Sequence, residues 1–180
     1  MQEADFNHFY QKYHGHLFQF LFYMVNDRAL AEDLVQEVYI RVLKSYDRFE
    51  GKSSEKTWLF SIARNVAIDS FRKQRSLKQR VLGKFNLSIY ELSDQKPLPE
   101  EIALAKEEIG YLYDCLQLCS IDQRMVIIHR YIHKNSIADT AISLGWSESK
   151  VKTTQHRALK RLKKHIQERG MGLPGHASGQ

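Results

Sequence analysis

The clearest structural signature in the chain reads Ser136-Ile-Ala-Asp-Thr-Ala-Ile-Ser-Leu-Gly-Trp-Ser-Glu-Ser-Lys-Val151. Ala141 is small at a point where two helices would have to cross closely, and Gly145 can adopt a left-handed turn. Val151 lies where it can pack back into the angle between the helices. This spacing predicts a helix-turn-helix, the arrangement in which a second helix can enter the major groove of DNA.

Both helices of this motif are expected to begin at good capping residues. Ser136 precedes Asp139 in a capping-box-like arrangement, and Ser147 precedes Glu148, whose charge suits a helix N-terminus. The apolar positions of the second helix, which we expect to face inward, are Val151, Leu159, Leu162 and Ile166. Its remaining side chains are mostly basic: Lys150, Lys152, Arg157, Lys160, Arg161, Lys163 and Lys164.

This basic helix has two interpretations. Side chains in its first turns can reach base edges while the basic residues around them neutralise phosphates. The alternative is a solvated, lysine-rich surface helix. The turn signature and the positive charge coincide on one element, which favours nucleic-acid binding.

Helical periodicity also runs through the first half of the chain. Apolar residues recur at helical spacing from Phe6 to Met24, from Leu30 to Tyr46, and from about Lys56 to Arg75. Gly51 is expected to end the second of these helices, and a serine in the following polar loop is available to cap the third. No stretch alternates as a β-strand over a useful length, so the predicted fold class is all-α.

A change in composition after Arg80 divides the chain. Gly83, Pro97 and Pro99 interrupt a stretch without strong periodicity, which predicts a linker. We therefore expect two small helical domains joined by a flexible linker, the second being a helix-turn-helix four-helix domain. The predicted boundaries are 5–77 for the first domain, 78–99 for the linker, 100–168 for the second domain and 169–180 for a disordered tail.

Composition limits the partners and the compartment. The net charge of +6 favours a polyanionic partner without naming it. Cys115 and Cys119 have neither a second cysteine pair nor a histidine at zinc-finger spacing, so we expect two buried reduced thiols. Residues 1–10 lack a signal-peptide pattern, and the apolar stretch 17–25 is too short to span a bilayer, which predicts a cytoplasmic protein.

A polar loop and a basic helix form a second candidate site in the first half. The loop 52–57 precedes Trp58, and a polar loop beside an aromatic residue can hold an unstacked base. Asn65, Asp69 and Arg72 share one face of the helix that follows. Structural alternatives remain open, because Trp58 also suits a core position and Asp69 with Arg72 suits an ordinary intrahelical ion pair.

Two parts of the chain resemble a known family. Residues 31–42, Ala-Glu-Asp-Leu-Val-Gln-Glu-Val-Tyr-Ile-Arg-Val, and the segment that begins Trp58-Leu-Phe-Ser-Ile-Ala-Arg-Asn resemble the second conserved region of bacterial extracytoplasmic-function (ECF) RNA polymerase sigma factors. Residues 136–158 resemble the fourth region of that family. The resemblance covers most of residues 5–168, with both motifs in the expected order. It implies a promoter-recognition subunit that is not an enzyme and needs no cofactor or metal.

The resemblance also implies which residues contact which partner. The clamp helices of the largest polymerase subunit would be bound by Asp33, Gln36, Glu37 and Arg41. The minus-ten promoter element would be recognised and opened by Lys52, Ser53, Ser54, Lys56, Trp58, Arg64, Asn65, Asp69, Arg72 and Lys73, with Asn65 as the best base-contact candidate. The minus-thirty-five element would be recognised by Ser147, Lys150, Lys152, Thr153, His156, Arg157 and Arg161.

The implied function is to bind core RNA polymerase and direct transcription initiation at a stress- or envelope-responsive regulon. The implied partners are core polymerase, promoter DNA and a membrane-anchored anti-sigma factor, which would hold the protein at the inner face of the membrane. No small-molecule substrate is expected. The alternative is a stand-alone helix-turn-helix transcriptional regulator, although the basic helix 64–75 is awkward for a sensor domain. An enzyme acting on nucleic acid would need clustered carboxylates or metal ligands, and Asp33 with Glu37 has no third ligand at matching spacing.

Two positions depart from the family pattern. Cys119-Ser-Ile-Asp122 stands where many members have Leu-Pro, so the entry to that helix can differ, with Asp122 as a possible cap. Thr154 stands where many members have Arg, which removes one phosphate or base contact. The minus-thirty-five specificity therefore cannot be copied from relatives.

Overall fold

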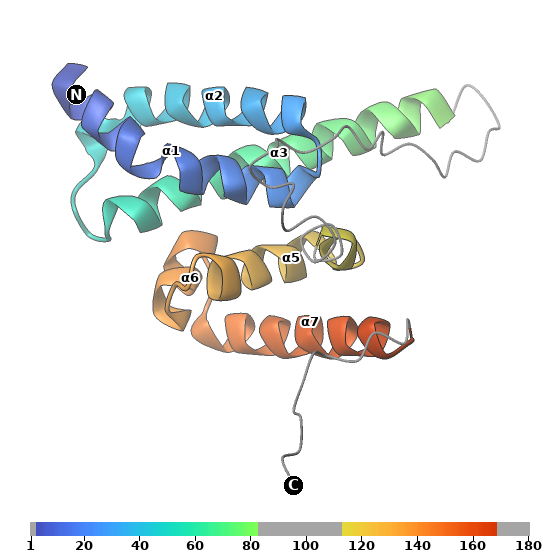
Figure 1. The fold of residues 1–180 in the computed structure, drawn as a ribbon. Coiled ribbons are helices and arrows are strands. Elements are labelled where there is room, and N and C mark those ends of the chain that lie inside the picture. The colour runs from blue at the N-terminus through green and yellow to red at the C-terminus, as the bar shows by residue number, and fades with distance from the viewer. Residues whose placement is uncertain (1–2, 83–112, 169–180) are drawn as a thin grey trace, which may run out of the picture.

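Helices arranged in two layers make up the fold (Figure 1). The computed structural model describes residues 3–82 and 113–168, with side chains for residues 6–77 and 113–167. Helices α1, α2 and α3 form one layer, and α5, α6 and α7 form the other, with α7 on the side away from the first layer. The described residues contain no β-strand, so the predicted all-α fold class is confirmed.

A sharp turn joins α1 (Glu3–Val25) to α2 (Arg28–Ser45). Asn26 has a positive φ of 52°, and Asp27 then caps α2 by accepting a hydrogen bond from the Leu30 N–H at 2.9 Å. The two helices pack together over a shared apolar core. The largest fully buried side chains of the first layer are Leu17, Phe20, Leu21, Met24, Val38, Leu59 and Phe60.

The connection from α2 to α3 differs from the prediction. We expected Gly51 to end α2, and this is wrong: α2 gives way at Tyr46 to a short 3₁₀ helix, η1 (Tyr46–Arg48). Gly51 instead makes a left-handed turn, with φ 68°, in the loop that follows. Ser54 then caps α3 (Glu55–Leu82) by accepting from the Thr57 N–H at 3.1 Å, which confirms the predicted serine cap.

In the second layer, residues 113–117 are helical and α5 (Ile121–Ile127) continues directly into a π-helix, η3 (Ile128–Ile132). The cap of α5 is Ser120, whose hydroxyl accepts from the Gln123 N–H at 3.3 Å while the Gln123 amide oxygen accepts from the Ser120 N–H at 3.1 Å. The suggestion that Asp122 caps this helix is therefore wrong. Asp122 lies in the first turn, where a negative charge suits the helix dipole.

The helix-turn-helix forms as predicted between α6 (Ile137–Leu144) and α7 (Glu148–Glu168). The Ser136 hydroxyl accepts from the Asp139 N–H at 2.9 Å, and the Ser147 hydroxyl accepts from the Lys150 N–H at 3.2 Å. Gly145 closes α6 in the left-handed conformation, with φ 62° and ψ 39°.

One member of the predicted apolar face of α7 is misplaced. Val151 is fully buried and Leu162 packs against the core, but Leu159 is 39% exposed. Ala158, which is fully buried, occupies the inward position instead, because a helical face that passes through Val151 continues at i+7 and i+11 rather than at i+8.

Several predictions fall outside the described residues: most of the linker 78–99, the first part of the predicted second domain up to residue 112, and the tail 169–180. Cys115 and Cys119 are described, and both are buried free thiols, as predicted. Burial raises the pKa of the Cys119 thiol, and the neighbouring Arg124 only partly opposes that effect.

Candidate nucleic-acid interface

Helix α7 presents its predicted DNA-contacting residues to solvent. Every residue of that set is exposed: Ser147, Lys150, Lys152, Thr153, His156, Arg157 and Arg161. Because α7 lies on the side away from α1, α2 and α3, the first layer does not cover this face (Figure 1). Thr154, the residue that departs from the family pattern, is half-buried.

Weak contacts orient the lysine side chains at the start of α7 without cancelling their positive charge. The Lys150 ammonium lies 3.7 Å from the centre of the Trp146 ring and 4.0 Å from the Asp122 carboxylate. Lys152 lies 3.7 Å from Glu148, one helical turn earlier. These ion pairs are exposed and cost little to break, so both lysines remain available to phosphate oxygens.

The first-layer candidates fall into two groups by exposure. The side chains of Lys52, Ser54, Asn65, Arg72 and Lys73 are exposed, whereas Ser53, Lys56, Trp58, Arg64 and Asp69 are half-buried. Trp58 lies against an aromatic pair, with ring centres 4.9 Å from Phe49 and 5.9 Å from Tyr46. Trp58 therefore packs against the core and keeps part of its surface accessible.

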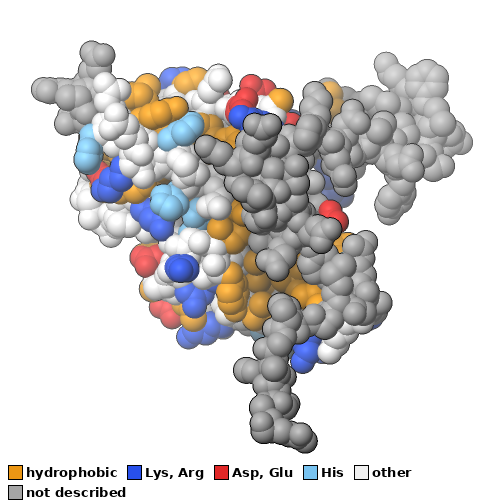
Figure 2. All heavy atoms as spheres, in the orientation of Figure 1, with side chains coloured by type: hydrophobic (Ala, Val, Ile, Leu, Met, Phe, Trp, Pro, Cys, Tyr) orange, Lys and Arg blue, Asp and Glu red, His pale blue; other side chains and the backbone are white. Residues whose placement is uncertain are grey.

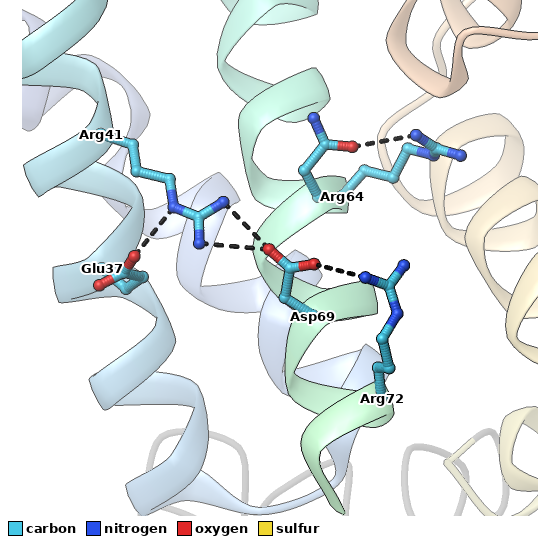
Figure 3. A network of polar contacts seen from close by, with 6 residues as sticks. Glu37, Arg41, Arg64, Asp69 and Arg72 are labelled. Atoms are coloured by element: carbon cyan, nitrogen blue, oxygen red, sulfur yellow. Dashed lines mark hydrogen bonds and ion pairs between the residues drawn. The ribbon is translucent and has the colours of Figure 1, made fainter. Parts of the chain in front are cut away.

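An ion-pair network connects two of the predicted sites (Figure 3). The Arg41 Nε donates to Glu37 at 2.9 Å, and both terminal nitrogens of Arg41 donate to Asp69 of α3 at 3.3 Å. Asp69 also lies 3.7 Å from Arg72. Hydrogen bonding to Glu37 is the main cause that raises the pKa of Arg41. The sequence suggested the Asp69–Arg72 pair but missed the shorter link to Arg41, which joins α2 to α3.

The exposed face of α2 is partly apolar. Asp33 and Gln36 are exposed and Glu37 is half-buried. Sequence reasoning missed Ile40 and Leu43, which are 46% and 48% exposed. Their spacing in the sequence could have identified them, because Ile40 and Leu43 follow Gln36 at i+4 and i+7 and so extend the same face of the helix. An apolar centre flanked by polar side chains is typical of a protein–protein interface.

A groove of about 390 Å³ lies beside this face, between α1 and α2. Its aromatic wall includes Tyr10, which stacks on His14 with ring centres 4.4 Å apart and makes a tilted contact with Tyr39 at 4.9 Å. His16, which also belongs to α1, faces His133 of the second layer instead, with ring centres 5.8 Å apart. Among the described residues, no group of three or more His, Cys, Asp or Glu side chains is placed to hold a metal ion.

An exposed basic helix in a helix-turn-helix, beside a second helical layer that carries a basic loop and helix, is typical of DNA-binding transcription proteins. Comparison with known proteins specifies the family. Family models of Sigma-70 region 2 and Sigma-70, region 4 match residues 9–77 and 109–162. The chain is 57% identical over 165 residues to the ECF RNA polymerase sigma factor SigX of Bacillus subtilis (strain 168), over 92% of this chain and 85% of that relative. The chain belongs to the ECF RNA polymerase sigma factors.

Solved structures agree with this assignment. The sigma factor RpoE, in a co-crystal structure with the anti-sigma factor NepR from Bartonella quintana, matches with a TM-score of 0.72 and 27% identity over 91% of this chain and 97% of that one. CnrH in complex with the cytosolic domain of CnrY shares the fold, with a TM-score of 0.69 and 18% identity over 93% and 90% of the two chains. Within the described residues, no helix has both the length and the apolar character needed to cross a membrane.

Proposed function

We propose that the chain binds bacterial core RNA polymerase and directs it to promoters that carry two spaced elements. Its family supports this proposal, and so does the exposure of all the α7 candidates together with the polar and apolar face of α2. The alternative, a stand-alone helix-turn-helix regulator, is not favoured, because the first layer matches Sigma-70 region 2 rather than a sensor domain. The mechanism is binding and strand separation, without chemistry on a substrate.

Each surface has a separate role in this proposal. On α2, Asp33, Gln36 and Glu37 contact polymerase, and Ile40 and Leu43 supply the apolar centre of the contact. On α3 and the preceding loop, Asn65 contacts a base while Arg72 and Lys73 neutralise phosphates. Arg41 and Asp69 act mainly by holding α2 against α3, because each uses its charge on the other.

The minus-thirty-five element is recognised by α7. Lys152, Thr153, His156 and Arg157 face the bases in this proposal, and Lys150 and Arg161 lie nearer to phosphates. Removing a phosphate contact should lower affinity for all sequences and reduce the slope of log affinity against log salt by about 0.9 per contact. Removing a base contact should instead relax specificity at one position and cost about 1–3 kcal/mol.

We also propose that an anti-sigma factor controls the protein and that it is membrane-anchored, which would hold the cytoplasmic sigma factor at the inner face of the membrane. Similarity to the sigma factor RpoE, which was solved in complex with the anti-sigma factor NepR, supports the first part. In the native bacterium, the protein should sediment with membranes until detergent is added. Recovery of the protein in the soluble fraction under non-inducing conditions would contradict the membrane anchoring.

The test of the main proposal uses purified core polymerase. The protein should co-elute with core enzyme from a sizing column at moderate salt, and the charge reversals Asp33→Lys and Glu37→Lys should weaken the complex. The matched control is Asp114→Lys, which reverses an exposed acid in the second layer and should leave co-elution unchanged. If the wild-type chain stays free of core enzyme yet binds duplex DNA as a dimer, the sigma-factor proposal fails.

A further inference from the structure

His129 of η3 and His133, the residue that follows η3, lie in the contact between the two layers. The His129 ring is fully buried, with its centre 5.3 Å from Phe20 of α1 and 5.4 Å from Phe60 of α3. The His133 ring is 6% exposed and lies 4.9 Å from Phe60. Both imidazoles are therefore covered by aromatic side chains of the other layer. Figure 2 shows exposed histidine, lysine and arginine side chains close together on the left of the molecule.

Neither imidazole has the partners that a charged ring would need. The His129 Nδ1 lies 3.0 Å from the Asn135 side-chain nitrogen, and its Nε2 is buried without a hydrogen-bond partner. Both ring nitrogens of His133 are likewise buried without partners. An imidazolium donates from both nitrogens, so protonation of either ring would bury at least one charged donor with nothing to accept its proton.

The surrounding charges also oppose protonation. Burial is the main cause that lowers the pKa of both rings to about 3, and the Lys56 ammonium on α3 lowers both further. His133 is additionally opposed by His129, whose ring centre is 6.5 Å away, and by His16 on α1. Within the described residues, the charged and titratable groups that act on these rings are all cations or imidazoles.

We propose that this interface is a proton-sensitive latch, in which neutral His129 and His133 hold the second layer against the first and protonation of either ring releases it. The closed state requires both rings to be uncharged. The open state exposes them to water, where they can accept a proton freely. Acid therefore shifts the equilibrium from closed to open without requiring the helices to unfold.

The latch also engages the loop that carries the minus-ten candidates. The Lys56 ammonium donates to the His133 backbone carbonyl at 3.4 Å, and the Ser143 hydroxyl donates to the Thr57 carbonyl at 3.3 Å. Thr57 itself is buried. Opening the interface would free this end of the loop for DNA. That consequence rests on the proposed function, whereas the opening itself does not.

Arg124 and Tyr113 also make contacts across the interface, and neither of them titrates in this range. The buried Arg124 guanidinium donates to the Met24 carbonyl at the end of α1, and Tyr113 packs against Phe22 and Tyr23 with ring centres 5.0 and 4.7 Å away. Burial lowers the pKa of Arg124 and raises that of Tyr113, which leaves the former cationic and the latter neutral near neutral pH. The pH dependence of the interface therefore comes from the histidines.

The sign follows from the two pKa values of each ring. In the closed state the rings stay neutral down to a pKa of about 3, and in the open state they protonate near the ordinary value of 6.5. Stabilisation of the closed state is complete above that ordinary value and is lost progressively as the pH falls below it. At about pH 5, each ring shifts the closed-to-open ratio about 30-fold toward the open state.

The test measures shape and helix content on the full purified chain, without polymerase or DNA. Small-angle X-ray scattering should give a larger radius of gyration at about pH 5 than at about pH 7.5, while far-UV circular dichroism shows that helix content is retained. The double variant His129→Phe, His133→Phe should stay compact at both pH values. His133→Lys should be expanded at neutral pH. The control His8→Gln, at an exposed position, should behave as the wild type.

Three results would overturn the latch. The first is a radius of gyration that does not change between the two pH values. The second is an equal expansion of the double phenylalanine variant and the wild type. The third is expansion accompanied by loss of helix, which would indicate acid unfolding. If the phenylalanine variant does not fold, His133→Lys and the wild-type titration still decide the question. A failure to bind polymerase would leave every one of these readouts unaffected.

Discussion

Replacing Gly145 by alanine tests whether the turn of the helix-turn-helix depends on backbone conformation alone. Gly145 has φ 62° and ψ 39°, and a Cβ placed on it would meet no atom within 4 Å. The substitution therefore adds no clash, and its cost comes from holding an L-residue in the left-handed region, about 1–2 kcal/mol. The reduced freedom of the unfolded chain offsets about 0.4–1 kcal/mol of that cost. We expect a net destabilisation of about 1 kcal/mol.

Gly15 provides a matched control for this substitution. It lies within α1, is exposed, and would also place a Cβ where no atom lies within 4 Å. Because its backbone is helical, Gly15→Ala should stabilise the protein by about 0.5–1 kcal/mol. The same chemical change in equally open space is thus expected to have opposite signs at the two positions. Gly145→Asn should cost less than Gly145→Ala, because Asn tolerates the left-handed conformation better.

The assay is urea unfolding followed by far-UV circular dichroism and by tryptophan fluorescence. Trp146 is adjacent to the turn, and Trp58 reports on the first layer. If the two layers unfold separately, Gly145→Ala should lower only the transition of the second layer, and Gly15→Ala should raise only that of the first. An unchanged midpoint for Gly145→Ala, or a loss of several kcal/mol, would refute the argument that conformation alone sets the cost.

Three further predictions concern the polar and buried groups of the fold. Asp69→Asn should destabilise the protein by about 0.5–1 kcal/mol in thermal unfolding, because it breaks a half-exposed ion pair with Arg41 that joins α2 to α3. Cys115 and Cys119 should react with a thiol reagent such as DTNB only after denaturant is added, because both are buried and burial raises the pKa of the Cys119 thiol. Ser120→Ala should cost about 1 kcal/mol in the same unfolding assay, because it removes the capping box of α5.

Exposed positions elsewhere serve as controls for these changes. Asp114→Asn removes an exposed acid and should leave the melting temperature nearly unchanged. Ser149→Ala lies in the first turn of α7 and should be neutral or slightly stabilising, since alanine favours helix. The ion-pair account is wrong if Asp69→Asn and Asp114→Asn have equal effects, and the burial account is wrong if either thiol reacts fully in the native protein.

Local features of the fold were predictable from the sequence because their causes are local. The caps at Ser136 and Ser147 and the left-handed turn at Gly145 each depend on residues within one helical turn, so spacing alone identified them. The wrong prediction at Gly51 also has a local cause. A glycine indicates a left-handed turn, but it does not show how many residues before that turn the helix ends. The Ser120 cap was missed, although Ser120 and Gln123 have the Ser-x-x-Gln spacing of a capping box.

The arrangement of the sites depends on contacts that are distant in sequence. Arg41 and Asp69 were assigned to different functions, and nothing in their separate helices indicates that they pair. The burial of His129 and His133 is likewise invisible in the sequence, because the atoms that cover them belong to α1 and α3. The roles of the individual polymerase and promoter candidates remain predictions for the binding assays to test.

The interface leaves the two proposed DNA-binding surfaces unequally available. Helix α7 faces away from the first layer with its basic residues exposed, while Lys56 and Thr57 of the proposed minus-ten loop contact the second layer directly. The closed chain should therefore make phosphate contacts with a duplex through α7 while one end of the proposed minus-ten loop remains occupied by the second layer. Such contacts alone give weak, salt-sensitive binding without strand separation. Any partner that contacts Lys56 and Thr57 must first separate the layers, so its binding should strengthen as the pH falls from neutral toward about 5, by up to the same 30-fold factor that each histidine contributes.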